Sequence, residues 1–215
     1  FASGGCPSLK NSLGYSFIAA PLTTMMGVLI AYIITRKQFW GRGVIDFGTV
    51  LIFAIPGTVI GVAYILAFNT PPLELTGTAI ILIITMAIRA MPVGIRGVMS
   101  ALSQISPSLE EASLLQRAGS ARTIRSVLIP ILRPTIVSSM AYSFIRSMTT
   151  VSAVIFLATA GTNVATTYIL SRVESGDTGV AVAYGSVLIF TMLCFTFLVQ
   201  ALTGRSRVEK QVKTQ

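Results

Sequence analysis

Five long apolar stretches divide the sequence, and short polar stretches separate them. They run Leu13–Thr35, Val44–Phe68, Leu75–Ile88, Ile129–Ala160 and Val180–Leu202. A helix needs about 20 apolar residues to cross the hydrocarbon core of a bilayer. The third stretch is shorter, and we expect it to span because the side chain of Arg89 can extend to the membrane surface. The pattern therefore predicts an all-α membrane protein with five transmembrane helices.

Composition supports the same conclusion. Apolar residues make up 53% of the chain and charged residues 11%, whereas soluble domains carry about 25% charged residues. A soluble fold would leave much of this apolar surface exposed in large patches. The net charge of +9 does not indicate nucleic-acid binding, because the basic residues lie between the apolar stretches and are not interleaved with aromatic residues.

The distribution of basic residues predicts the orientation in the membrane. Thirteen of them fall on one side if five helices alternate: Arg36, Lys37, Arg42, Arg89, Arg96, Arg117, Arg122, Arg125, Arg133, Arg205, Arg207, Lys210 and Lys213. The other side holds Lys10 and Arg172. Cytoplasmic connections carry the excess of Lys and Arg. We therefore expect the N-terminus outside the cell and the C-terminus in the cytoplasm.

Small residues and prolines occur within the apolar stretches. Gly57 and Gly61, in the sequence GTVIG, are spaced for close contact between helix backbones. The same residues next to Pro56 also fit a hinge, and the sequence leaves both interpretations open. Pro21, Pro56 and Pro92 each remove a helical hydrogen bond, which a membrane tolerates where neighbouring groups satisfy the freed backbone.

The connection from Arg89 to Arg133 contains its own helix signals. Ser108 followed by Glu111 has the spacing of a capping box, apolar residues follow, and Gly119 is suited to end a helix. We expect a short helix with an acidic first turn on the cytoplasmic face. An amphipathic helix resting on lipid headgroups is the alternative.

The run EEASLLQRAGSARTIRSVLIPILRP resembles the signature loop of binding-protein-dependent ABC transporter permeases. Glu111 and Ala112 match the start of that signature, Ser113 replaces its second alanine, and Ile129 with Pro130 stands for its Leu-Pro. At the signature glycine the chain has Arg117, and Gly119 follows two residues later. Elsewhere in the chain, SLKNSL, PGTVIGVAYILAF, MPVGIRG and SFIRSMTTVSAVIFL are similar to permeases of the ferric-iron importer group.

This resemblance implies a type I ABC importer permease in a bacterial-type inner membrane. Residues 1–12 would be extracytoplasmic, residues 13–203 would form the permease domain, and residues 204–215 would be a cytoplasmic tail. A coupling loop at about residues 100–128 would contact a separate ATPase subunit. The implied loop residues are Glu110, Glu111, Ala112, Ser113, Gly119 and Pro130. The two glutamates would meet basic groups of the ATPase.

The resemblance also implies a second permease half, an extracytoplasmic solute-binding protein, and inward movement of a solute, with ferric iron as the expected cargo. A polyamine, a phosphonate or an inorganic oxyanion is the alternative cargo. A secondary transporter without an ATPase and a membrane scaffold without transport activity are rivals of a different class. Because the chain begins at Phe1, we expect it to be the C-terminal half of a longer two-half permease.

The sequence lacks the motifs of an enzyme or a metal site. It has no His and no G-x-x-x-x-G-K-[ST] run, and Cys6 and Cys194 lack metal-ligand spacing. We expect no catalytic residue, no bound cofactor or metal, and no disulfide between these cysteines. ATP would be used by the partner subunit.

Arg146 interrupts the fourth apolar stretch, 13 residues after Arg133, which places it about 20 Å further along a helix. A charge at the centre of a bilayer costs about 2.5–3.5 kcal/mol, so we expect it to face protein or water. It would either line a translocation path and attract an anionic cargo, or donate to backbone carbonyls. Four neighbouring hydroxyl residues could line the same path: Ser143, Ser147, Thr149 and Thr150.

Overall fold

The computed structural model describes residues 4–116 and 119–212. Its elements are α1 (Gly5–Arg36), α2 (Arg42–Ala54), α3 (Gly57–Phe68), α4 (Ala79–Ser103), α5 (Ser108–Leu115), α6 (Ser120–Thr123), the π-helix η1 (Ile124–Leu128), α7 (Ile129–Met148), the 3-10 helix η2 (Val154–Phe156), α8 (Ala165–Glu174) and α9 (Thr178–Val212). No β-strand occurs in these described ranges. The predicted all-α fold is confirmed.

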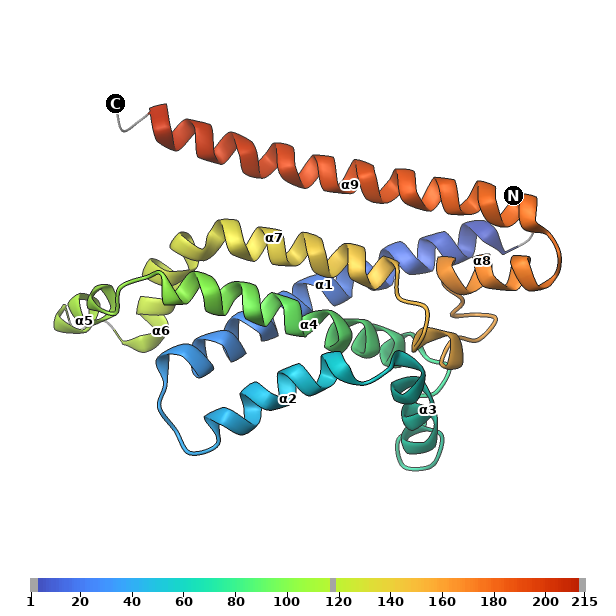
Figure 1. Cartoon of the computed structure of the whole chain (residues 1–215), viewed down its shortest axis with the longest axis horizontal. Helices are drawn as coiled ribbons and strands as arrows, with labels where there is room; N and C mark the ends of the chain where they lie inside the picture. Colours follow the sequence, from blue (N-terminus) through green and yellow to red (C-terminus); the bar gives the residue numbers. More distant parts are fainter. Residues whose placement is uncertain (1–3, 117–118, 213–215) are drawn as a thin grey trace.

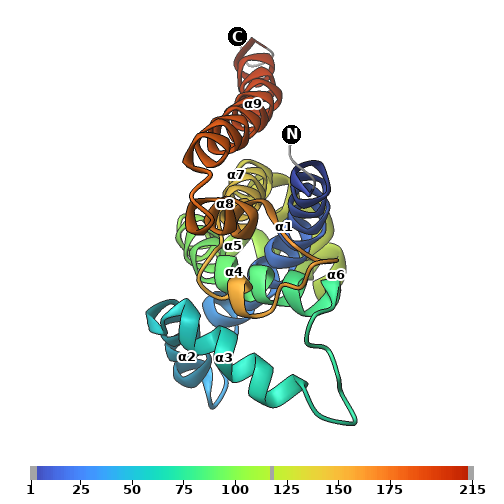
Figure 2. The ribbon, with the colours of Figure 1, turned by 90° about the vertical axis from the view of Figure 1, so that its right-hand side faces the viewer.

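Three helices, α1, α4 and α7, pack side by side and form the centre of the molecule (Figure 1). The bent pair α2–α3 lies on one side of this centre, and α9 lies on the other (Figures 1 and 2). The short helices α5 and α6 lie at one end, and α3 and α8 lie toward the opposite end. Helix α9 starts at the end that carries α8 and runs toward the end that carries α5 (Figure 1).

Four helices in the described part of the chain are long and apolar enough to cross a membrane, namely Gly5–Arg36, Ala79–Ser103, Ile124–Met148 and Thr178–Ala201. They correspond to the first, third, fourth and fifth predicted spans. The third predicted span ended too early, because Arg89, Pro92 and Arg96 all lie inside α4. The expected cytoplasmic connection therefore begins after Ser103 instead of at Arg89.

The fourth predicted span was wrong at both ends. Its helix starts at Ile124, in the π-helical turn, and ends at Met148 instead of Ala160. The hydroxyls of Thr149 and Thr150 donate to the carbonyl of Arg146 at 3.2 and 2.7 Å. Such local bonds between side chain and backbone compete with helix continuation. Residues up to Ala160 form a loop that contains η2.

The second predicted span is broken. Helices α2 and α3 meet at Ile55 and Pro56 with a bend of 105°, so the pair is either one broken crossing or a re-entrant segment. Pro56 has no N–H to continue the helix. The Ile55 carbonyl accepts a hydrogen bond from Arg89 Nη1 at 3.3 Å. Of the three prolines expected to remove a helical hydrogen bond, Pro56 lies at a break between helices, whereas Pro21 and Pro92 lie inside α1 and α4.

Gly57 and Gly61 allow α3 to approach the loop that follows α7. A Cβ on Gly57 would overlap the hydroxyl of Ser152, and a Cβ on Gly61 would lie 2.7 Å from the carbonyl oxygen of Ala153. The expected close packing of these glycines is confirmed. The adjacent break at Pro56 shows that packing and a change of chain direction coexist at this point.

Small and hydroxyl residues hold the central helices together. Along α1 the buried positions are Gly5, Ser8, Ser12, Ser16, Ala19, Ala20, Thr23, Thr24, Gly27 and Ala31, followed by Ile34. Ser139, Ser143 and Ser147 of α7 are also buried. Lipid chains are as apolar as leucine, so membrane helices associate through close packing and hydrogen bonds. The Thr23 hydroxyl, for example, donates to the Ala87 carbonyl of α4 at 3.1 Å.

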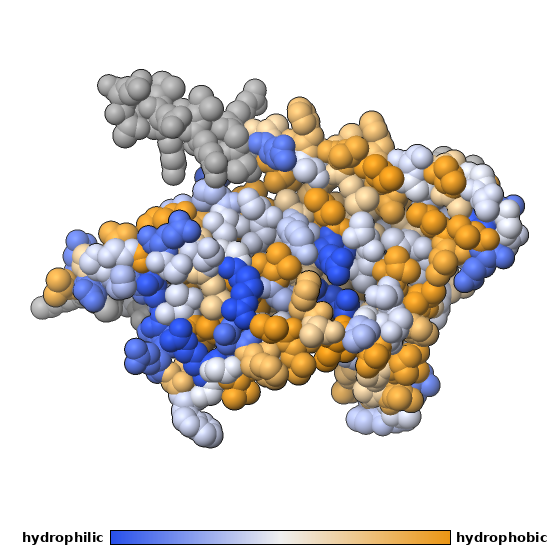
Figure 3. Space-filling model, in the orientation of Figure 1, coloured by the Kyte–Doolittle hydropathy of each residue, from blue (hydrophilic) through white to orange (hydrophobic). Residues whose placement is uncertain are grey.

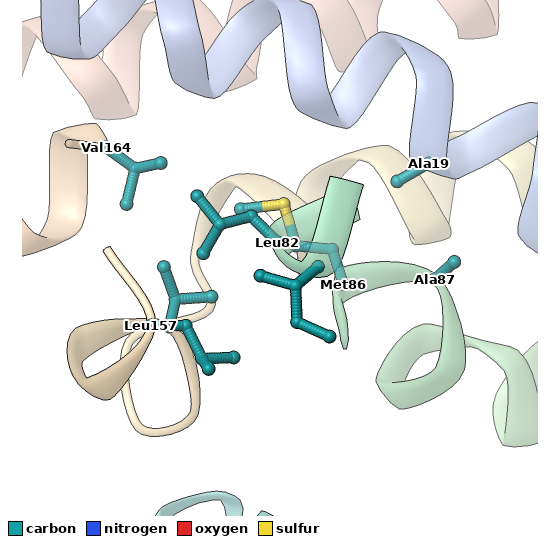
Figure 4. Packing of buried hydrophobic residues seen from close by; sticks show 8 residues of the cluster. Ala19, Leu82, Met86, Ala87, Leu157 and Val164 are labelled. Carbon is teal, nitrogen blue, oxygen red and sulfur yellow. The ribbon is translucent and has the colours of Figure 1, made fainter. Parts of the chain in front are cut away.

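Larger apolar side chains fill the space between these close contacts. Figure 4 shows one such cluster, in which Ala19 of α1 meets Leu82, Met86 and Ala87 of α4 together with Leu157 and Val164. A second cluster near the connection between α4 and α7 includes Ile95, Leu102, Leu128 and Leu132.

The outer faces of the helices are apolar as well. Exposed residues include Phe17, Met25, Val44, Phe47, Val182, Phe190 and Phe197. Figure 3 shows that hydrophobic residues cover much of the visible face, while hydrophilic ones gather toward the end that carries α5. This surface is suited to a bilayer, with a polar end at the predicted cytoplasmic side.

Candidate functional site

The short helix expected in the cytoplasmic connection is present as α5 (Ser108–Leu115). Its start differs from the predicted capping box. The Ser106 hydroxyl accepts a hydrogen bond from the Ser108 N–H at 3.3 Å, and the Pro107 carbonyl accepts from the N–H groups of Glu110 and Glu111. The side-chain acceptor at the start of α5 is therefore Ser106, and Pro107 lies immediately before the first helical residue, where its missing N–H has no consequence.

The expected end of this helix was also misplaced. Helix α5 ends at Leu115, and Gly119 lies immediately before α6, where its carbonyl accepts from the Thr123 N–H at 3.0 Å. Gly119 is not among the described glycines with a positive φ, so it does not form a left-handed cap. Arg117, at the signature glycine position, lies outside the described residues.

Two side-chain contacts fix α5 to the rest of the chain. At its start, Glu110 Oε1 lies 2.8 Å from Arg36 Nε at the end of α1, and both side chains are largely buried. In its second half, the hydroxyls of Ser113 and Thr123 lie 2.8 Å apart, which connects α5 to α6. The contact of Glu110 with an ATPase remains a prediction.

The other predicted loop residues face solvent. Glu111, Ala112 and Gly119 are exposed, and Pro130 is exposed at the start of α7. The apolar side chains of Leu109 and Leu115 are exposed on the same short helix, Leu115 by 86%. An acidic residue beside exposed leucines fits contact with a protein partner, and it also fits the alternative of an amphipathic helix on lipid headgroups.

Arg146 lies in the last turn of α7, not in the middle of a span as expected. Its side chain is half-buried, and none of the ion pairs found in residues 4–116 and 119–212 includes it. Arg89 of α4 lies close enough to Arg146 for the two positive charges to repel each other. The two arginines therefore place positive charge beside the bend between α2 and α3.

The expected path-lining hydroxyls divide into two kinds. Ser143 and Ser147 are buried, with exposed fractions of 0% and 1%, at positions where α7 packs closely in the helix bundle. They face other helices and not an open channel in this conformation. Thr149 is exposed, and Thr150 is buried and bonded to the Arg146 carbonyl.

An open cavity of about 430 Å³ lies between α4 and α7 near the start of the connection that joins these two helices. Polar and small residues line it: Gly97, Ser100, Ala101, Gln104 and Thr135, with Ile105, Ile131 and Leu132. Sequence reasoning missed this cavity. The only signal was the presence of small and polar residues where α4 extends beyond its predicted end.

Two further ion pairs were also missed. Asp46 of α2 lies 2.9 Å from Arg96 of α4. At the opposite end of the molecule, Arg172 of α8 lies 3.1 Å from Asp177. A hydrogen bond with Tyr168, followed by the effect of Asp177, raises the pKa of Arg172. Among the described residues, no group of three or more His, Cys, Asp or Glu side chains is arranged to hold a metal ion.

Comparison with known proteins gives consistent matches. Residues 23–208 match the family described as binding-protein-dependent transport system inner membrane component. The chain is 50% identical over 209 residues to the ferric transport system permease protein FbpB of Actinobacillus pleuropneumoniae, covering 97% of this chain and 30% of the relative. It is 30% identical over 209 residues to the sulfate transport system permease protein CysT of Salmonella typhimurium, covering 91% of this chain and 76% of the relative.

Among solved structures, the chain resembles a bacterial ABC transporter involved in the import of the acidic polysaccharide alginate. The TM-score is 0.81 at 17% identity, over 95% of this chain and 80% of that one. This likeness establishes the fold. The chain spans less than a third of the length of the ferric permease relative.

Proposed function

Since the chain belongs to the family of binding-protein-dependent inner membrane transport components, we propose that it is a permease part of an ATP-driven importer. It passes a solute from an extracytoplasmic binding protein into the cytoplasm. ATP is hydrolysed by a separate subunit, and a second permease half completes the pathway. The N-terminus of the chain lies outside and its C-terminus in the cytoplasm, as the distribution of basic residues predicts.

The observation that supports this mechanism best is the position of α5. The helix lies between two long apolar helices, α4 and α7, and it presents Glu111, Leu109 and Leu115 to solvent. A short helix that is held at both ends moves its neighbours when a partner moves it. It therefore suits the transmission of force from an ATPase to the membrane helices.

Ferric iron is the proposed cargo, because the relative with 50% identity is named as a ferric transport permease. The oxyanion alternative has support of its own. The relative with 30% identity is named as a sulfate permease, and Arg89 and Arg146 place positive charge beside the bend between α2 and α3. Uptake of radioactive iron and of radioactive sulfate by the same reconstituted transporter separates these two proposals.

The coupling role is tested with the full-length permease, its ATPase and its binding protein reconstituted in vesicles. In Glu111→Lys we expect insertion to be unchanged and binding-protein-stimulated ATP hydrolysis and uptake to be lost. Glu174→Lys, a charge reversal at an exposed residue of α8, is the matched control and should retain both activities. Unchanged stimulated hydrolysis in Glu111→Lys would contradict the coupling role of α5.

A further inference from the structure

The guanidinium of Arg36 contacts three segments at once. Its Nε lies 2.8 Å from Glu110 Oε1 on α5. Its Nη2 donates to the carbonyl of Leu102 in the last turn of α4 at 3.0 Å and to that of Ile105, just beyond α4, at 2.7 Å. One side chain at the end of α1 thus joins the end of α4 to the start of α5.

The surroundings of this ion pair are largely closed to solvent. The Arg36 and Glu110 side chains are 11% and 17% exposed, and the Tyr32 side chain lies beside the same carboxylate. A charged donor at the last carbonyls of a helix satisfies groups that have no partner within the helix. Removing one partner of such a pair leaves the other charge buried without compensation, which costs more than loss of an exposed pair.

The second side-chain contact of α5 connects it to the segment that precedes α7. Ser113 contacts Thr123 at the end of α6, and η1 and α7 follow directly in the chain. Helix α5 is therefore connected to α1 and α4 through Arg36, and to α7 through Thr123. Of these two attachments, only the first reaches α1, whose stripe of small residues packs against both α4 and α7.

We propose that Arg36 is a positioning residue for coupling, and that its contact with Glu110 transmits the displacement of α5 to α1 and α4. This inference rests on the proposed function, because it describes how force from an ATPase reaches the membrane helices. The contact stays closed through the transport cycle, so that α1, the end of α4 and the start of α5 move together. Glu110 is an internal anchor of α5, while Glu111 faces the partner.

The first experiment compares matched variants of the full-length permease, reconstituted with the ATPase and binding protein. Arg36→Met and Glu110→Gln remove the ion pair. Lys37→Met and Glu74→Gln remove the same charges at exposed positions. We expect stimulated ATP hydrolysis and uptake to fall about tenfold in the first two, within the range typical of coupling between sites, while the ATPase still binds. Both controls should match the unaltered transporter.

Cross-linking separates coupling from a loss of stability. In a background without other cysteines, the double variant Arg36→Cys with Glu110→Cys should show reduced stimulated ATP hydrolysis and reduced uptake before any cross-linker is added. A short bifunctional thiol reagent then restores the link, and we expect it to recover uptake. If a stability defect alone were responsible, the variants would show reduced insertion and reduced ATPase binding, which would overturn the proposal.

Two other outcomes would also overturn it. Arg36→Met with full stimulated hydrolysis and uptake would show that the contact carries no coupling. Uptake abolished by the cross-link would show that the contact must open during transport. If instead the unaltered transporter shows no stimulated hydrolysis at all, it is the proposed function that fails.

Discussion

The close approach of α3 to the loop after α7 gives a sharp test of the packing. In Gly61→Ala, the new Cβ would lie 2.7 Å from the carbonyl oxygen of Ala153, 3.0 Å from Cδ2 of Phe156 and 3.3 Å from the Ala153 Cα. Two of these atoms belong to backbone, so they cannot move aside as the end of a flexible side chain would. Overpacking of this kind costs about 1–3 kcal/mol.

The intrinsic effect of the substitution has the opposite sign. Alanine is more favourable than glycine in a helix by about 0.8–1.0 kcal/mol. Gly48→Ala in α2 is the matched control, because a Cβ at Gly48 meets no atom within 4 Å. We expect the control to keep or raise the free energy of unfolding and Gly61→Ala to fall below it by about 1–3 kcal/mol.

Both variants are compared by equilibrium unfolding of the full-length permease in mixed micelles. The difference between the two variants is the informative quantity, since each includes the same helix-propensity term. Equal unfolding free energies for Gly61→Ala and Gly48→Ala would refute the close contact between α3 and the loop after α7.

Two further predictions concern buried polar groups. Ser12→Ala removes the hydroxyl that accepts from the Ala165 N–H at 2.7 Å, so it should lower the unfolding free energy by about 1–3 kcal/mol. The control Ser138→Ala, at an exposed position, should change the unfolding free energy little. Equal unfolding free energies for the two variants would contradict the buried hydrogen bond. Arg146→Gln removes a positive charge near Arg89, so it should leave the unfolding free energy unchanged or higher. If Arg146 attracts the cargo, uptake falls in this variant. Undiminished uptake would show that Arg146 has no role in transport.

Four of the five predicted long helices, and their order, follow from the sequence, because apolar length in a bilayer is a strong constraint. Their ends do not. Charge was expected to end the third span at Ile88, yet α4 continues past Arg89 and Arg96, since Arg89 bonds to the carbonyl freed at the α2–α3 bend and Arg96 pairs with Asp46. These partners come from elsewhere in the chain, and no local pattern reveals them.

The candidate site shows the same division between local and tertiary information. The short helix near Glu111 was predictable from the residue types at its start, although the hydroxyl that accepts a backbone N–H there belongs to Ser106 and not to Ser108. The contact of Arg36 with Glu110 was not predictable, because 74 positions separate the two residues in the sequence. The basic residues near the ends of spans indicated orientation, but they did not indicate which of them has a partner inside the protein.

The stripe of serine, alanine, threonine and glycine along α1 has a mechanical consequence. Residues this small let the helix backbones lie close together, and hydrogen bonds such as that from Thr23 to the Ala87 carbonyl join the helices directly. Helices α1, α4 and α7 should therefore travel as a single rigid block. The joints that absorb any change of shape must then lie at its margins, at the bend before Pro56 and in the loop that follows Met148.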